Sequence, residues 1–183
     1  WKYGWNIVPV GIIGLLIIVY YTGWINKHPL ICLIAPGIGF GFLMVEGAYF
    51  ALTGEYSTLL WVIGLVPFFL VNNLLLLNQY PDIEADLSVG RFHFPIAYGT
   101  KISNIIYFLF VVMTILVIVS AVITGFLPAL SLIALFPMPL AFFSLSGAIK
   151  YGDTLGNHPQ YLAANVTVTI LSPTLLGLSI IFA

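Results

Sequence analysis

The amino-acid sequence predicts an all-α integral membrane protein with about six transmembrane helices. Three observations lead to this fold class. The chain of 183 residues is 61% hydrophobic and only 6% charged, whereas an ordinary soluble domain carries about 25% charged residues. Its apolar residues form long stretches, each near the length of about 20 residues that a helix needs to cross a bilayer. Its basic residues lie mostly in alternate loops, which places them on one side of the membrane.

The first three expected spans cover residues 5–21, 30–52 and 58–77. Each is a long apolar run, as expected for a helix that satisfies its own backbone hydrogen bonds in lipid. Glu46 falls inside the second span, where it either faces a cavity or pairs with an asparagine of a neighbouring span, such as Asn72 or Asn73. These two asparagines fall inside the third span, where an amide needs a partner on another helix.

The last three expected spans cover residues 102–123, 127–149 and 162–182. Several of the six spans contain prolines, namely Pro36, Pro67, Pro137, Pro139 and Pro173. Membrane helices tolerate proline because neighbouring groups satisfy the freed backbone atoms. The sequence shows no internal repeat and no soluble second domain, so we expect one transmembrane domain over residues 1–183.

The basic residues predict the orientation of the spans. Lys27, Arg91, Lys101 and Lys150 lie in the first, third and fifth connections, and only Lys2 lies on the other side. By the positive-inside rule, the side with more Lys and Arg faces the cytoplasm. We therefore expect a multi-pass protein of the cell or inner membrane, with its two long loops on the cytoplasmic face. The net charge of −1 gives no reason to expect a nucleic-acid partner.

An acidic motif follows the third span. Asn78, Asp82 and Asp86 are four residues apart, and each such step on one continuous helix turns by about 40°, so all three would share a face. Glu84 would point away from them. Pro81 either kinks the helix or begins a new one, and the pairing of Asp82 with Asp86 holds in both cases.

Two carboxylates on one face suit a hard cation at the membrane surface. Mg²⁺ prefers oxygen ligands and completes its shell with waters or substrate phosphates. Arg91 follows closely enough in the sequence to bind the remaining phosphate oxygens. The alternative is a solvated acidic loop that only caps a helix. His93 and His158 are expected to be polar loop residues, because Mg²⁺ does not favour imidazole over oxygen.

At these residues the chain resembles the UbiA superfamily of membrane prenyltransferases. Asn78, Asp82 and Asp86, followed by residues 88–91, are similar to the second aspartate-rich motif of that family. The resemblance is closest to the 1,4-dihydroxy-2-naphthoate polyprenyltransferase branch and extends over most of the chain. It is carried further by residues 20–23, 39–41, 47–50, 53–55 and 165–173.

The resemblance implies a Mg²⁺-dependent transfer of a prenyl group from an isoprenoid diphosphate to an aromatic quinone precursor, as in menaquinone biosynthesis, or to a related lipophilic acceptor. The family fold is a ring of nine helices with two aspartate-rich motifs. Only the second motif is found here, so this chain is expected to be the last six helices, to need about three N-terminal helices as partner, and to be inactive alone. Residues 90–93 also depart from the family, in which two basic residues commonly follow the glycine.

The resemblance also implies roles for individual residues. Asp82 and Asp86 would hold Mg²⁺ and act as the catalytic pair, with Asn78 and Arg91 binding the diphosphate. Lys27 either contacts phosphate or only sets the topology. Four aromatic residues near the span ends either face an allylic cation or anchor the membrane interface: Tyr21, Tyr49, Phe50 and Tyr80. Of these, Tyr21 and Tyr80 are the predicted substrate-binding residues.

Two other classes of protein remain open from the sequence. A transporter or channel subunit would carry ionisable residues through the depth of the membrane, and here only Glu46 is clearly deep. A catalytically inert protein that kept the UbiA fold is the second. Metal-dependent binding of a prenyl diphosphate distinguishes the enzyme from both.

Overall fold

A computed structural model describes residues 4–183 and is all-helical over that range. Six of its helical segments are long and apolar enough to cross a membrane: Trp5–Gly23, Pro29–Thr53, Thr58–Asn78, Phe94–Ile123, Ala129–Asn157 and Pro159–Ile181. The expected all-α integral membrane fold with about six spans is therefore confirmed. Lys2, which the sequence placed on the less basic side, lies outside the described residues.

The spans contain shorter elements that break or extend the α-helices. The second span consists of α2 (Pro29–Gly37), the π-helical segment η3 (Ile38–Leu43) and α3 (Met44–Thr53). The fifth consists of η4 (Ala129–Leu135), α7 (Met138–Tyr151) and η5 (Gly152–Asn157). The other elements are η1 (Gly4–Ile7), α1 (Val8–Gly23), η2 (Ile25–Lys27), α4 (Thr58–Asn78), α5 (Ile83–Ser88), α6 (Phe94–Ile123) and α8 (Pro159–Ile181).

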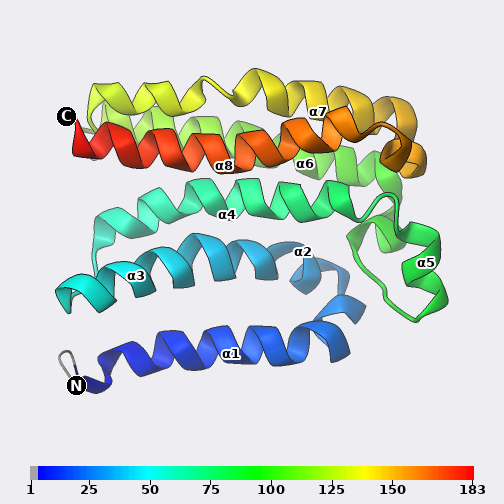
Figure 1. The fold of residues 1–183 in the computed structure, drawn as a ribbon, viewed down its shortest axis with the longest axis horizontal. Helices are drawn as coiled ribbons and strands as arrows, with labels where there is room; N and C mark the ends of the chain where they lie inside the picture. The colour runs from blue at the N-terminus through cyan, green and yellow to red at the C-terminus, as the bar shows by residue number, and fades with distance from the viewer. Residues whose placement is uncertain (1–3) are drawn as a thin grey trace.

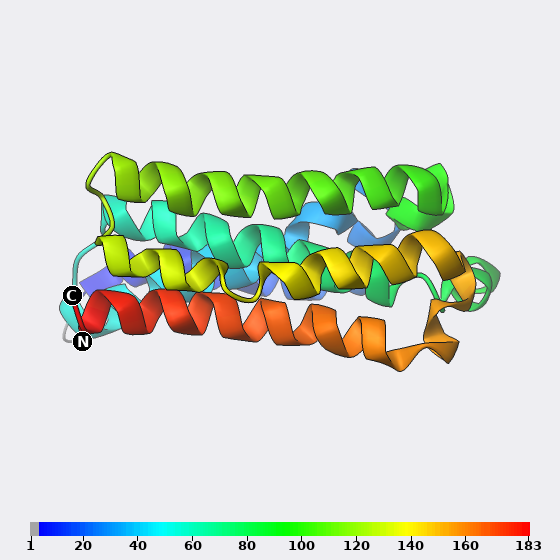
Figure 2. The ribbon, with the colours of Figure 1, turned by 90° about the horizontal axis from the view of Figure 1, so that it is seen from above.

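The helix α4 lies in the middle of the bundle. It packs against the second span on one side and against α6 and α8 on the other (Figures 1 and 2). The helix α1 lies at the edge, where it contacts mainly η1, η2 and η3, and none of its residues is buried. Such an apolar, exposed helix suits lipid or a neighbouring membrane helix as its surroundings.

Close backbone contact joins the second span to α4. A Cβ atom added to Gly41 would lie 2.6 Å from the carbonyl oxygen of Gly64, so both positions need glycine. Beside this contact, the backbone N–H of Gly37 donates to Asn72 Oδ1 at 2.6 Å. The amide that the sequence placed inside the third span thus finds its partner on the second span, where Pro36 and η3 interrupt regular helix.

Two further polar residues of the spans have specific partners. Asn73 Nδ2 donates to the Tyr107 carbonyl at 3.0 Å, and Asn165 Nδ2 donates to the Asn73 carbonyl at 3.1 Å. Glu46 is buried and pairs with neither Asn72 nor Asn73. Its Oε2 instead accepts the backbone N–H of Ser57, at 3.4 Å, just before α4 begins.

The loops that carry the basic residues lie at one end of the bundle. Figure 1 shows the turn between α1 and α2, the short helix α5 and the turn between α7 and α8 at the same end. The segment α6 consists of two helical pieces, because Gly99, with a φ of 78° and a ψ of 164°, is not helical. The long piece after Gly99 begins close to the expected residue 102, and residues 94–98 form a short helical stretch before it. This bend at Gly99 keeps residues 94–98 close to the loop that contains Asp82 and Asp86 (residues 79–93, the acidic loop).

Candidate functional site

The acidic motif occupies a turn between two helices. The helix α4 ends at Asn78, the chain turns through Pro81, and α5 begins at Ile83. The backbone N–H of Asp86 donates to the Asp82 carbonyl at 2.7 Å, which sets the first turn of α5. Asn78 therefore does not share one continuous helix with the two aspartates. All three nevertheless line the same cavity, Asn78 from the end of α4 and the two aspartates from beyond the turn.

This cavity, of about 200 Å³, lies where the loops of the first three spans meet. The backbone N–H of Phe92 donates to the Asn26 carbonyl at 2.8 Å and ties the acidic loop to the first loop. Residues of α1, η2, α2, the end of α4 and the acidic loop thus share one hollow. Its lining is Tyr21, Thr22, Asn26, Cys32, Leu75, Asn78, Gln79, Asp82, Asp86, Arg91 and His93.

Asp86 is held by two neighbours. Arg91 Nη1 donates to Oδ1 at 2.8 Å, and His93 Nε2 lies 3.2 Å from Oδ2. The Asp86 side chain is 13% exposed and the Arg91 side chain 47%. Burial lowers the pKa of His93 below its ordinary value, and the attraction of Asp86 offsets this only in part. Arg91 is the charged partner of Asp86, and its exposure leaves it free to reach a ligand.

Asp82 faces the cavity differently. Its side chain is exposed, and within residues 4–183 its carboxylate has no hydrogen bond or ion pair. Over the same residues, no group of three or more His, Cys, Asp or Glu side chains is arranged to hold a metal ion. Two carboxylates with open coordination positions fit Mg²⁺ only if phosphate or water oxygens complete its shell. The donor set therefore fits a metal that arrives with a phosphate ligand.

The remaining predicted site residues divide into two groups. Tyr21 and Asn78 line the cavity, and the Tyr21 hydroxyl lies 3.9 Å from Cys32 Sγ. Lys27 is exposed and is not part of the lining. Tyr80 is fully buried, and its hydroxyl donates to Asn104 Oδ1 at 2.8 Å, so it fastens the end of α4 to α6 instead of facing the cavity.

The sequence did not point to four polar residues that line the cavity: Asn26, Cys32, Gln79 and His93. Gln79 Nε2 donates to Cys32 Sγ at 3.7 Å, and Asn26 Oδ1 is buried with no hydrogen-bond partner among the described residues. The only signal available was that each lies near the end of a span on the basic face.

An apolar groove adjoins the polar cavity. It has a volume of about 740 Å³, lies between α1 and the second span, and shares Tyr21, Thr22 and Leu75 with the cavity. Gly11 and Gly14 of α1 line it without side chains that would fill it. Together the two hollows form a site with one charged part and one apolar part.

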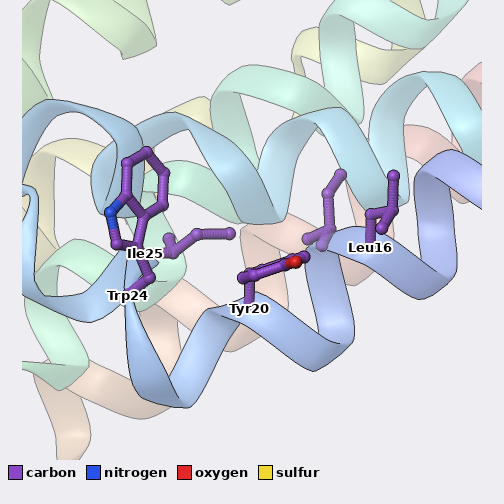
Figure 3. A pocket seen from close by; sticks show the side chains of 5 residues that line it. Leu16, Tyr20, Trp24 and Ile25 are labelled. Atoms are coloured by element: carbon purple, nitrogen blue, oxygen red, sulfur yellow. The ribbon is translucent and has the colours of Figure 1, made fainter.

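A smaller apolar hollow of about 390 Å³ lies at the C-terminal end of α1. Figure 3 shows Leu16, Tyr20 and Trp24 following one another along the same side of α1, with Ile25 at the end. Its lining contains no charged side chain, so this hollow suits a lipid chain and not a phosphate.

The fold is that of a helical integral membrane protein with a polar site at one end of its bundle. The comparison with known families then assigns it further: residues 1–166 match the UbiA prenyltransferase family, and the chain belongs to that family. Its members transfer prenyl groups to lipophilic acceptors and generally depend on Mg²⁺. Comparisons with curated proteins and with solved structures gave no match.

Proposed function

We propose that the protein transfers a prenyl group from an isoprenoid diphosphate to an aromatic quinone precursor, with Asp82 and Asp86 as the ligands of Mg²⁺. The observation that supports this most strongly is that the polar cavity with its two aspartates and the apolar groove are neighbours that share Tyr21, Thr22 and Leu75 in their walls. A prenyl diphosphate has the same two parts, a charged head and an apolar tail. The likeness to the naphthoate-prenylating branch favours that class of acceptor.

The charged residues of the cavity would act on the leaving group. Negative charge grows on the diphosphate as the allylic C–O bond breaks, and groups placed to receive that charge lower the barrier. Arg91 is half-exposed beside Asp86, so its guanidinium can turn toward a phosphate oxygen while its stem stays in place. When bound, Mg²⁺ would neutralise part of the same charge as a Lewis acid.

The apolar groove would hold the prenyl chain and keep water from the allylic cation. Apart from the hydroxyls of Tyr21 and Thr22, its side chains are apolar or glycine, and exclusion of water protects a reactive cation from hydrolysis. Tyr21 lies where the groove meets the polar cavity. An aromatic ring at that point can stabilise the cation through its face.

We also propose that the complete site contains further acidic ligands on other helices. Asp82 and Asp86 are the only carboxylates that line this cavity within residues 4–183. Two carboxylates bind one Mg²⁺ weakly and leave much of the diphosphate charge without a counterion. Groups that act as a unit lose most of their effect when a partner is missing.

Binding of a non-hydrolysable donor tests the proposal. Farnesyl thiolodiphosphate is titrated with and without Mg²⁺ into the detergent-solubilised wild type, Asp82→Asn and Asp86→Asn. We expect Mg²⁺ to tighten binding in the wild type and to have little effect in either variant. Glu84→Gln is the matched control, because Glu84 lies on the same short helix but lines a different cavity. Equal Mg²⁺-dependent affinity in all four proteins would reject the site.

A further inference from the structure

His93 is an unusual residue within the cavity. Its side chain is only 2% exposed, and neither ring nitrogen has an aligned hydrogen-bond partner among the described residues. A buried polar group without a partner destabilises a fold, so its presence needs an explanation. Its Nε2 lies 3.2 Å from Asp86 Oδ2.

The position of His93 at the start of α6 does not explain its side chain. The carbonyl oxygen of His93 accepts the backbone N–H of Ala97 at 3.1 Å, and its side chain makes no capping hydrogen bond. Any residue can supply that carbonyl. The imidazole therefore does not cap the helix, and among residues 4–183 the polar contact that it makes is with Asp86 of the acidic motif.

His93 and Arg91 approach Asp86 from different sides. Arg91 bonds to Oδ1 and His93 lies against Oδ2, so rotation of the carboxylate is restricted at both oxygens. Each oxygen keeps a second lone pair for another partner. A carboxylate held in this way presents those lone pairs to the cavity in one orientation, which is what a metal ligand requires.

On the basis of the proposed function, we infer that His93 is a positioning residue that orients Asp86 for Mg²⁺ through the contact between its Nε2 and Asp86 Oδ2. It does this from the end of the loop between α5 and α6. His93 acts through Asp86 and is not itself the metal ligand, since Mg²⁺ prefers oxygen.

Three substitutions separate this role from simple packing. His93→Phe keeps the ring volume and loses the nitrogen donor. His93→Gln places an amide nitrogen near the position of Nε2, and His93→Asn places one nearer the backbone, out of reach of Oδ2. Loss of an outer-shell partner commonly weakens metal binding about 10- to 100-fold. We expect the Phe and Asn variants to lose about 10-fold in apparent Mg²⁺ affinity and the Gln variant to stay within about 3-fold of wild type.

The readout is the Mg²⁺ concentration that gives half-maximal binding of farnesyl thiolodiphosphate, measured without turnover. Melting temperatures of all variants report folding, and the Gln and Asn variants stay informative if His93→Phe does not fold. Equal Mg²⁺ affinity for His93→Asn and wild type, while Asp86→Asn loses it, would overturn the role of His93 and leave the proposed function standing. No Mg²⁺ effect in the wild type would instead overturn the proposed function and this inference with it.

Discussion

Replacement of Arg91 by glutamine shows whether its guanidinium binds the diphosphate or only pairs with Asp86. Its Nη1 lies 2.8 Å from Asp86 Oδ1, and its side chain is 47% exposed. An ion pair as open as this contributes about 0–1 kcal/mol to stability. We therefore expect the free energy of unfolding to change by no more than that.

The effect on donor binding should be larger. Two unit charges about 4 Å apart attract by about 4 kcal/mol at an effective dielectric constant near 20. Solvent around the half-exposed Arg91 screens much of this, so we expect a loss of about 1.4–2 kcal/mol. That loss corresponds to a Kd for farnesyl thiolodiphosphate raised about 10- to 30-fold.

The assay is titration of the donor analogue at several salt concentrations. Arg91→Lys should fall between wild type and Arg91→Gln, because it keeps the charge but loses the planar pair of donors. Lys101→Gln is the control, since Lys101 is an exposed basic residue on α6 that does not line the cavity. A change below 2-fold for Arg91→Gln, similar to that of Lys101→Gln, would refute a contact between Arg91 and the diphosphate.

Three further predictions concern the fold and its completeness. Single cysteines at positions 27, 91 and 150, in a Cys32→Ser background, should all be labelled from the cytoplasmic side, and labelling of 91 and 150 from opposite sides would reject the six-span arrangement. Asn72→Leu should lower stability by about 1–3 kcal/mol, because the buried N–H of Gly37 loses its acceptor. Thr174→Val, at an exposed position of α8, is the control. Equal unfolding transitions for Asn72→Leu and wild type would contradict this prediction. The 183-residue chain alone should not prenylate dihydroxynaphthoate or hydroxybenzoate, whereas adding helices that carry further acidic ligands should restore turnover; robust turnover by the chain alone would show that two carboxylates suffice.

The spans could be predicted because lipid requires long apolar helices, and that requirement is visible in the sequence. The fourth span was predicted from residue 102 because Thr100 and Lys101 interrupt the apolar run, and in the structure Gly99 separates the short helical stretch 94–98 from the long helix that follows. The sharing of a cavity by Asp82 and Asp86 followed from their spacing. Asn78 joins them for a different reason, since the chain turns at Pro81 and does not continue as one helix.

The polar neighbours of the aspartates could not be predicted, because they come from separate spans. Asn26 lines the cavity from the first loop, and its carbonyl accepts the N–H of Phe92 from a loop far along the chain. Tyr80 shows the opposite case. It follows Asn78 closely in the sequence, yet its hydroxyl bonds to α6 and its ring is buried away from the cavity. Closeness in the sequence does not determine the direction of a side chain at the end of a helix.

The most direct test of the central claim is the reaction itself. The chain, together with helices that carry the proposed further acidic ligands in one polypeptide or as a separate chain, is incubated with a labelled prenyl diphosphate, an aromatic acceptor and Mg²⁺. The account predicts a prenylated acceptor whose formation requires Mg²⁺, is abolished by Asp82→Asn or Asp86→Asn, and is retained by Glu84→Gln. Mg²⁺-dependent product formation that persists in both aspartate variants would contradict it.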